Sequence, residues 1–490
     1  MSDRIEPARG TNRGSARSAV VSGEWPLWST TLRDRTAAAV ADPVLRRNVA
    51  AAVDRFAGGR VTALAGLHDA DGLRSAARAV RADVIDHWAD ILEELADNVL
   101  ARGGHVCWAA DAAEARSYVV DVASRIGART VVKSKSMVTE EISLNEALEA
   151  GGCRVTETDL GEWIIQLAAE HPSHILVPAV HRDRHQIAEV FDRRAGRPGG
   201  PADPEVLTAF ARGALRDRFL QADLGITGVN FGVAETGSLV LVTNEGNGRL
   251  VSALPRVHIA VMGAERVVRT WEQLDLMLNL LARSGTGQPL SAYTSITTGP
   301  RAAGEVDGPD ELHLVIVDNG RSGLAGTEMN EMLNCIRCGA CLNVCPVYRQ
   351  TGGHAYGWVY PGPMGAVLTP LLAARGPDDT RAAEASSAST LCGACMEACP
   401  VEIPLQDLLL GLRRRKASHA AGRDRLVWRA WAAAWRRPGP YRDGNRLAVR
   451  ARRLLPLVRH LPAGHRWIDG RTLPALPART FTERWDAGDV

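Results

Sequence analysis

The stretch CIRCGACLNVCP, residues 335–346, has four cysteines in the spacing C-x₂-C-x₂-C-x₃-C-P. In ferredoxins this spacing holds a [4Fe–4S] cluster, because three thiolates on one tight loop reach three irons of the cube. A second run, CGACMEACP at residues 392–400, repeats the C-G-A-C and C-P elements with only three cysteines. Aligned backwards from Cys399, the absent first cysteine falls at Ser389. The repeat predicts a small α-helical domain of the two-cluster ferredoxin type.

The fourth cysteine of each run precedes a proline and is expected to turn away and serve the other cluster. The crossover predicts these ligands: Cys335, Cys338, Cys341 and Cys399 for cluster one, and Cys345, Cys392 and Cys395 for cluster two. Three interpretations of the corner at Ser389 stay open: a cube with one open iron, a [3Fe–4S] centre, or a cube completed by the Ser389 hydroxyl or a more distant group. Zinc is disfavoured, because tetrahedral zinc takes four ligands in paired C-x₂-C groups.

The bulk composition predicts a soluble, cytoplasmic protein. Clustered cysteines indicate metal rather than disulfides, and the other two, Cys107 and Cys153, are expected to be small buried residues near strands. No run approaches the roughly 18 apolar residues of a membrane span, and the N-terminus lacks the apolar segment of a signal peptide.

The C-terminal region is strongly basic. Residues 411–490 hold 19 Lys and Arg against 6 Asp and Glu, a net charge of +13 in a chain whose total is +2. Such asymmetry is typical of a surface that meets an acidic partner, a membrane or nucleic acid. Helical spacing places Trp428, Trp431 and Trp435 on one face, and we expect this stripe to pack on the protein rather than on a membrane.

Between the N-terminus and the cysteine runs, helical and strand patterns alternate, which predicts a parallel sheet covered on both faces. Predicted strands include residues 105–110, 130–133, 154–157 and 174–178. The predicted organisation is a helical lead-in with a disordered start (1–80), an α/β domain (81–324), the ferredoxin-type domain (325–410) and the basic tail (411–490).

Other polar residues are candidates for a site. Lys133 and Lys135 lie at the end of a predicted parallel strand, where α/β sheets bind ligands. Two interpretations stay open: the lysines form an anion clamp, or they are two solvated residues of a loop. Glu235 and Glu245 lie beside glycines, and we favour turn carboxylates over nucleophiles. Four histidines interrupted by prolines are expected on the surface or in a substrate cleft rather than around a metal: His171, His174, His181 and His185.

Long stretches of the chain resemble the lactate utilization protein B family. They include VVKSKSMVTEEISLNEALEAGG, TDLGEWIIQLAAEHPSHILVPAVHRDR and GVNFGVAETGSLVLVTNEGNGRLVSALPRVHIAVMGAERVV, together with both cysteine runs, and cover most of residues 30–485. The resemblance implies a lactate-utilisation domain related in fold to CoA transferases and sugar-phosphate isomerases. It also implies two [4Fe–4S]-type clusters with the ligand sets given above, and makes the missing cysteine at 389 a family trait.

The resemblance further implies an electron-transfer subunit that takes part in the oxidation of L-lactate to pyruvate with partner subunits and passes electrons to a respiratory acceptor. We expect no nucleic-acid partner and at most a peripheral contact with a membrane. The alternatives are an acyl- or CoA-handling enzyme that uses Glu235 or Glu245, and a scaffold whose clusters are only structural. No G-x-G-x-x-G motif follows a strand in the right context, so nothing in the sequence indicates that the chain binds NAD or FAD.

Overall fold

The computed structural model describes residues 25–373, 379–418, 422–452 and 475–489, together with Leu454 and Leu457. The chain divides into two compact units, residues 1–413 and 414–490, and each is described by itself. The predicted disordered start falls on residues 1–24, outside the described residues. Among the described helices, none is long and apolar enough to cross a membrane.

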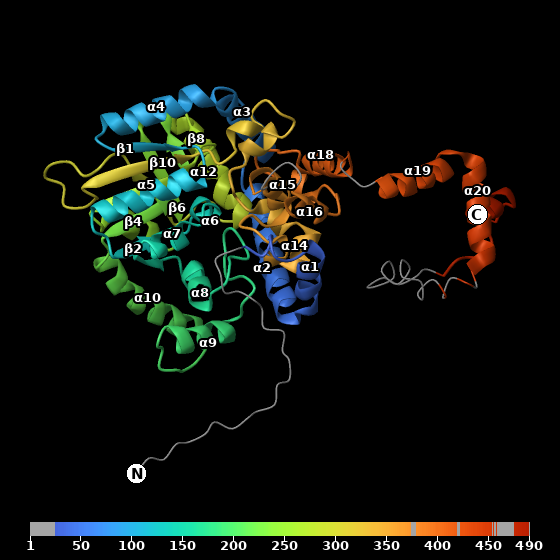
Figure 1. The fold of residues 1–490 in the computed structure, drawn as a ribbon, viewed down its shortest axis with the longest axis horizontal. Coiled ribbons are helices and arrows are strands. Elements are labelled where there is room, and N and C mark those ends of the chain that lie inside the picture. Colours follow the sequence, from blue (N-terminus) through green and yellow to red (C-terminus); the bar gives the residue numbers. More distant parts are fainter. Residues whose placement is uncertain are drawn as a thin grey trace, which may run out of the picture. The chain divides into compact units, whose positions relative to one another are not determined.

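The first unit is built on a six-stranded sheet in which all neighbouring strands are parallel (Figure 1). This confirms the predicted α/β class. In spatial order the strands are β1 (His105–Ala109), β10 (Glu311–Val317), β7 (Val257–Gly263), β4 (Leu224–Gly228), β2 (Thr130–Lys133) and β3 (Arg154–Glu157).

Helices cover both faces of this sheet because successive strand residues point to opposite sides. On one face Val315 and Val317 of β10 pack with apolar residues of α5 (Ala112–Arg125) and α7 (Leu144–Ala150), which follows α6 (Met137–Glu141). On the other face Leu314 and Ile316 join a core that includes α4 (Trp88–Ala101) and α12 (Trp271–Gly285). A third core, beside β2, is formed by α8 (Leu160–Ala168), α9 (Arg184–Arg194) and α10 (Pro204–Leu220).

A second, smaller sheet packs in the same core as α4 and α12. Its order is β8 (Val267–Val268), β5 (Phe231–Val233), β6 (Ser238–Thr243) and β9 (Tyr293–Thr297). The 3₁₀ turn η1 (Ala234–Thr236) joins β5 to its antiparallel neighbour β6, and α11 (Asn247–Ala253) follows β6 and covers β4.

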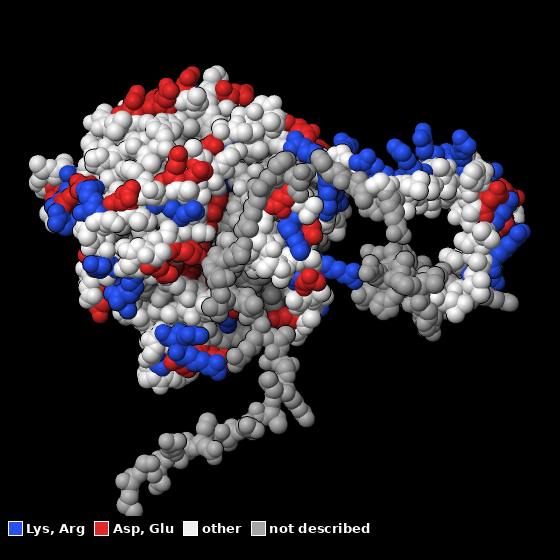
Figure 2. All heavy atoms as spheres, viewed as in Figure 1, with Lys and Arg blue, Asp and Glu red and all other residues white. Residues whose placement is uncertain are grey.

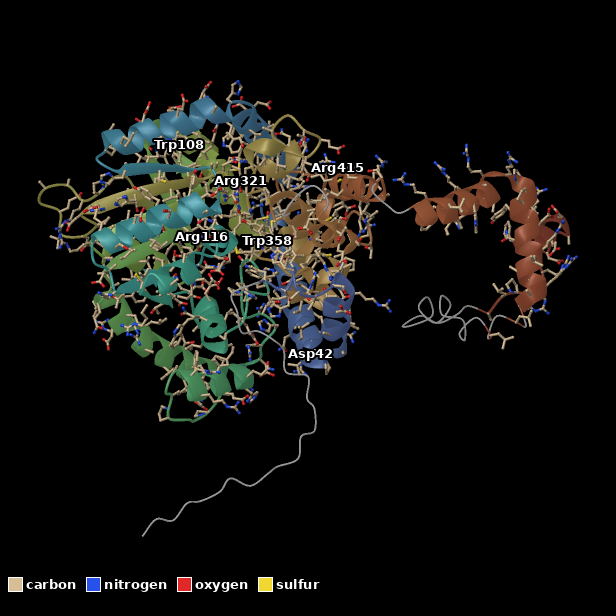
Figure 3. The ribbon with its side chains drawn as sticks, viewed as in Figure 1. Asp42, Trp108, Arg116, Arg321, Trp358 and Arg415 are labelled. Carbon is tan, nitrogen blue, oxygen red and sulfur yellow. The ribbon has the colours of Figure 1, made fainter. Side chains whose placement is uncertain are left out.

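The helical lead-in consists of α1 (Leu32–Ala41), α2 (Pro43–Ala65) and α3 (Ala70–Asp86). The Asp42 side chain, labelled in Figure 3, starts α2 by accepting hydrogen bonds from the amides of Val44 and Leu45. Since α2 contacts both α12 and the cysteine region, the lead-in belongs to the same compact unit. The domain boundaries proposed from the sequence remain predictions.

The cysteine region is a set of short helices, as predicted. They are η2 (Ser322–Leu324), η3 (Asn330–Asn334), α13 (Ala340–Asn343), α14 (Pro346–Thr351), η4 (His354–Tyr356), α15 (Gly362–Leu372), α16 (Thr380–Glu384), η5 (Ala385–Ser387), α17 (Ala394–Glu397) and α18 (Leu405–Ser418).

The predicted strand at residues 174–178 is wrong, because this segment is a loop of bends and turns. Its backbone groups are bonded to side chains instead of to a neighbouring strand. The amides of Leu176 and Val177 donate to Nδ1 of His174, and the carbonyl of Leu176 accepts from Nζ of Lys135 at 2.7 Å.

The second unit contains α19 (Gly422–Arg436), α20 (Pro438–Arg450) and α22 (Phe481–Asp486), and Figure 2 shows many Lys and Arg side chains on it. The helix α19 ends at Arg436, two residues before Pro438. The rings of Trp431 and Trp435 stack 5.5 Å apart, and Trp435 lies 5.1 Å from Tyr441. Within this unit the three tryptophans stay 52–65% exposed, so the expected buried stripe is not present there.

Candidate iron–sulfur centres and the adjoining cavity

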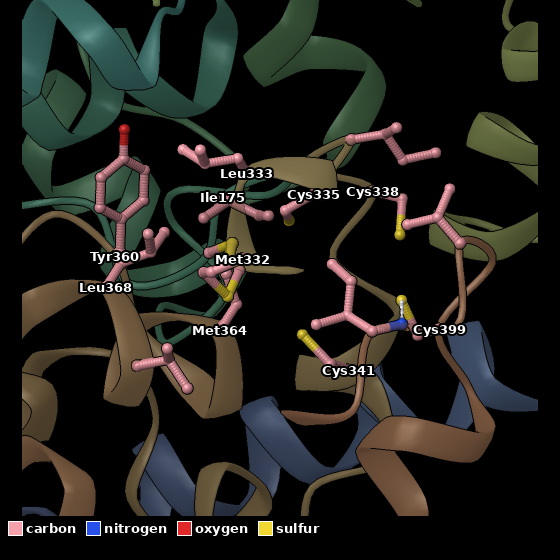
Figure 4. Packing of buried hydrophobic residues seen from close by; sticks show 14 of the residues in the cluster. Ile175, Met332, Leu333, Cys335, Cys338, Cys341, Tyr360, Met364, Leu368 and Cys399 are labelled. Atoms are coloured by element: carbon pink, nitrogen blue, oxygen red, sulfur yellow. Dashed lines mark hydrogen bonds between the residues drawn. The ribbon is translucent and has the colours of Figure 1, made fainter. Parts of the chain in front are cut away.

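Four cysteines from both runs line one small cavity: Cys335, Cys338, Cys341 and Cys399. Figure 4 shows their side chains around a common space, beside Met332 and Met364. Two backbone features bring the first three together. Arg337 adopts a left-handed conformation, and Gly339, with φ of 78°, starts α13. The set in this cavity is the one that the crossover predicts for cluster one.

A second small cavity gathers the other three cysteines: Cys345, Cys392 and Cys395. Ser389 lines the same cavity, and its Oγ accepts a 3.1 Å hydrogen bond from the amide of Leu391. Pro346, which follows Cys345, is the first residue of α14, so the chain turns away from the first cavity at that position.

The chemistry of these thiols fits an iron–sulfur cluster. Burial, followed by repulsion from Cys345 and Cys392, raises the pKa of Cys395 to about 11. Burial likewise raises the pKa of Cys399 to about 12. Because thiolates crowded in an apolar cavity repel one another, they need a positively charged centre among them, which the irons of a cluster provide.

Three arginines surround the loop of the first cavity, two of them buried and Arg337 partly buried; we call Arg81, Arg266 and Arg337 the arginine group. Arg266 donates to the carbonyl of Cys335 at 2.9 Å, and Arg81 donates to the carbonyl of Leu333 at 3.1 Å. Arg81 and Arg266 are 0% and 4% exposed. These guanidinium groups place positive charge where a cluster with four thiolates would bring negative charge.

Glu265 and Arg321 tie the arginine group to the sheet. Oε2 of Glu265 accepts from Nε of Arg321 at 2.6 Å, and Oε1 accepts from Nη2 of Arg337 at 2.9 Å. Arg321 also forms a bidentate pair with Glu141, whose Oε2 accepts from the hydroxyl of Tyr360. Arg321, labelled in Figure 3, is buried. Burial opposes the ionised form of Glu265, but the arginines outweigh it and lower its pKa to about 2.

A larger cavity, of about 530 Å³, lies at the carboxyl ends of β2, β4 and β7. Residues after these strands form one wall, β6 and α12 form another, and Arg337, Cys338 and Tyr360 close it. Cys338 therefore borders both this cavity and the first cysteine cavity. The end of α12 fits against the cysteine loop because Gly285 has no Cβ, which would lie 2.5 Å from the carbonyl of Cys338.

The two candidate lysines have different environments. Lys133 is fully buried, and its Nζ lies 2.8 Å from Oε1 of Glu157 and 3.0 Å from Oε1 of Glu140. It neutralises these carboxylates and does not line the cavity, so the anion-clamp interpretation is wrong for Lys133. Lys135 does line the cavity and uses one N–H on the carbonyl of Leu176.

The two candidate glutamates also have different environments. Glu235 accepts a hydrogen bond from the amide of Trp271 at 2.8 Å at the start of α12, which is the predicted turn role. Glu245 lines the large cavity, and its Oε2 accepts from the amide of Leu160 at 2.9 Å. Loss of water contact, together with repulsion from Asp159, raises the pKa of Glu245 to about 7.

Three of the four candidate histidines are structural, which corrects the expectation of surface or cleft positions. His171 stacks on Trp25 with ring centroids 3.9 Å apart. His174 is buried with Nε2 3.2 Å from Oδ1 of Asn343, and His181 contacts Glu170 at 2.9 Å. His185 is exposed at the start of α9.

Three family models match the chain in sequence order. The LUD domain matches residues 92–317, a 4Fe-4S dicluster domain matches residues 331–403, and the C-terminal region of lactate utilisation protein B matches residues 411–489. Lactate utilization protein B of Shouchella clausii is 47% identical over 453 residues, which cover 91% of this chain and 94% of that protein. The chain belongs to the lactate utilization protein B family.

Other members of the lactate utilization protein B family agree. The protein of Bacillus subtilis is 47% identical over 423 residues, covering 86% of this chain and 87% of its own length. The protein of Macrococcus caseolyticus is 53% identical over 374 residues, which cover 76% of this chain and 77% of that protein. A crystal structure of a DUF162 family protein from Deinococcus radiodurans covers 47% of this chain and 98% of its own, at 16% identity and a TM-score of 0.27.

The family membership confirms the resemblance, the order of the LUD and iron–sulfur domains, a role in lactate utilisation and the presence of iron–sulfur clusters. Sequence reasoning missed the arginine group and Glu265. Isolated arginines give no signal by themselves. Arg337 lies inside the first cysteine run, and Glu265 and Arg266 lie at the end of a stretch that carries the family resemblance, but nothing local pointed to their contact with the cysteine loop.

Proposed function

We propose that the protein is the iron–sulfur electron-transfer subunit of a system that oxidises L-lactate to pyruvate. It would act with partner subunits in the cytoplasm and pass electrons towards a respiratory acceptor. The observation that carries this proposal is that two cavities, each lined by cysteines from both runs, lie in one compact unit. Two redox centres held in a single compact unit are what an electron-carrying subunit needs.

The cysteines of the first cavity would hold a [4Fe–4S] cluster with four thiolates, and those of the second would hold one with three. Bound there, each cluster supplies a centre that takes up and releases one electron at a time. Ser389 lines the second cavity, but a serine hydroxyl keeps its proton at neutral pH and is a poor ligand beside thiolates, which supports an open corner on cluster two.

The chain's own residues set the surroundings of these centres. Buried side chains such as Met332, Met364 and Leu405 line the first cavity and exclude water. The arginine group adds positive charge beside the thiolates, which favours the more negative, reduced state of a bound cluster.

An acyl- or CoA-handling enzyme is the second candidate. One observation favours it: Glu245 lines the large cavity, and the pKa of its carboxyl group is raised to about 7. Glu235 does not support it, because its carboxylate binds the amide of Trp271. Acyl transfer would leave a covalent adduct on Glu245, whereas electron transfer would not, so mass spectrometry after incubation with an acyl-CoA separates the two.

The proposed function is tested by purifying the native complex and adding L-lactate under anaerobic conditions while EPR follows the clusters. We expect lactate-dependent reduction of both clusters and iron and sulfide contents that match them. A Cys341→Ser variant should lose the signal of the first cluster. The matched control is Cys107→Ser, because Cys107 lies on β1 away from both cysteine cavities. If L-lactate leaves intact clusters oxidised in the complete complex, the proposal fails.

A further inference from the structure

The large cavity has polar groups that await a partner. Among the described residues, the Oγ of Ser134, the Oγ1 of Thr243 and the Nη1 of Arg337 are buried atoms without a hydrogen-bond partner, and all three residues line this cavity. Ser134 is only 1% exposed. Leaving such groups unpaired is costly. Each can donate a hydrogen bond, so the complementary ligand carries oxygen acceptors.

The rest of the lining indicates the body of that ligand. Aliphatic and aromatic side chains, among them Phe56, Leu176, Leu241 and Leu281, form much of the walls. A cavity of about 530 Å³ is the size of pockets that enclose cofactor-sized molecules. It is far larger than a three-carbon acid needs. The cavity therefore suits a larger, mostly apolar molecule with a few acceptor oxygens.

The position of the cavity adds a redox argument, which rests on the proposed function. Cys338 forms part of its wall and also lines the first cysteine cavity. Oxidation of lactate to pyruvate removes two electrons and two protons, whereas an iron–sulfur cluster exchanges single electrons. Flavins and quinones, whose rings carry carbonyl oxygens, accept two electrons together and can give them up singly.

We propose that this cavity binds a planar two-electron carrier of the flavin or quinone class, with ring carbonyls towards Ser134, Thr243 and Arg337 and one edge against Cys338. Flavins and quinones both have a planar ring system that carries carbonyl oxygens. The described residues that line the cavity all belong to the first unit.

The test uses the full-length protein with its clusters reconstituted anaerobically and no other subunit present. Equilibrium dialysis measures binding of FMN in one arm and of menadione, a naphthoquinone, in the other. We expect saturable binding of one molecule per chain in at least one arm, which identifies the source. The bound ring should shift the EPR signal of the first cluster and leave that of the second unchanged.

Variants test the location. Val242→Trp places an indole in the cavity wall and should weaken binding at least tenfold, while Thr243→Val should weaken it several-fold through loss of one donor. The matched control is Ile296→Trp, at a half-exposed position of β9 that does not line the cavity. Iron content, measured in each variant, should not change, which separates a blocked cavity from a misfolded protein.

Three outcomes would overturn the inference: neither ring binds, binding persists unchanged in Val242→Trp, or L-lactate displaces the ring by occupying the same cavity more tightly. These results are independent of the proposed function. Lactate-dependent reduction of the clusters in a complex that holds no flavin or quinone would leave the proposed function standing and remove this inference. Ring binding without any lactate-dependent reduction of the clusters would leave this inference standing and remove the proposed function.

Discussion

Arg266 donates a 2.9 Å hydrogen bond from its guanidinium to the carbonyl oxygen of Cys335. The two residues are far apart in sequence, yet the turn that follows β7 brings the buried arginine to the backbone of the first cysteine of the iron–sulfur run. Arg266 also lies over the ring of Phe231, 4.7 Å from its centroid. The guanidinium is thus held in place by one hydrogen bond and one cation–π contact.

This contact predicts a role in setting the reduction potential of cluster one. Arg266→Gln keeps a hydrogen-bond donor but removes a buried positive charge, so the reduced cluster becomes less favourable. We expect the potential to fall by on the order of tens of millivolts, measured by an EPR-monitored redox titration. Arg212→Gln, on the exposed face of α10, is the control and should leave the potential unchanged. A potential that does not move in Arg266→Gln would contradict the prediction.

Replacement of Glu265 should destabilise the first unit. Glu265→Gln removes the carboxylate between Arg321 and Arg337 and leaves two buried cations less compensated. Breaking a buried pair in this way costs about 3–5 kcal/mol, which calorimetry would detect as a lower unfolding temperature. Glu189→Gln removes an exposed pair with Arg193 and should cost less than about 1 kcal/mol.

The low pKa of Glu265 gives this prediction a pH dependence. Burial opposes ionisation, but the arginines lower the pKa of Glu265 from its ordinary value of 4.5 to about 2. Its ionised form therefore stabilises the folded protein fully above pH 4.5, and this contribution is lost as the pH falls towards 2. The difference in unfolding temperature between wild type and Glu265→Gln should shrink over that range. A constant difference would mean that the charge of Glu265 is not the cause.

The crossover of the fourth cysteines predicts which cluster each substitution damages. Cys399→Ser should impair cluster one although Cys399 belongs to the second run, because it lines the first cavity. Cys345→Ser should impair cluster two for the same reason. EPR of the reduced variants distinguishes the two signals. Damage by each substitution to the cluster of its own run would refute the crossed assignment.

Cluster two should have a labile iron at the corner near Ser389. A serine hydroxyl is a poor ligand beside thiolates, since its proton is far harder to remove at neutral pH. Mild oxidation should give a [3Fe–4S] EPR signal, and ferrous iron with a reductant should restore the cube. Ser389→Cys should resist this oxidation, whereas Ser389→Ala should behave as wild type. If wild type keeps its cube and Ser389→Ala loses it, serine is the ligand.

Because the tryptophans of the second unit stay exposed within it, we revise the expectation that they pack on the protein and predict that this unit confers binding to anionic membranes. It exposes Trp428, Trp431 and Trp435 on a strongly basic segment, and each Lys or Arg near an anionic surface contributes about 1 kcal/mol. Flotation with anionic vesicles should recover the full-length protein at low salt and not at high salt. A chain ending at residue 413 should keep its iron, because all seven cluster cysteines precede that point, but should not float. Equal flotation of both chains would contradict the prediction.

The sequence alone determined the local features of this protein. The spacing of the cysteines, with Pro346 and Pro400 after the last of each run, was enough to predict two crossed ligand sets, because covalent spacing limits which thiolates reach one cube. The alternation of helical and strand patterns predicted the parallel sheet. These features depend on neighbours within a few residues, so a single chain displays them.

Tertiary structure decided what distant residues do. Lys133 and Lys135 are equivalent in the sequence, but strand geometry buries the first among carboxylates and places the second in the cavity. The predicted strand at 174–178 became a loop because His174 and Lys135 bind its backbone. The contacts of Arg266 and Glu265 with the cysteine loop join segments about 70 residues apart. Such contacts depend on how elements pack, and no local pattern of side chains encodes them.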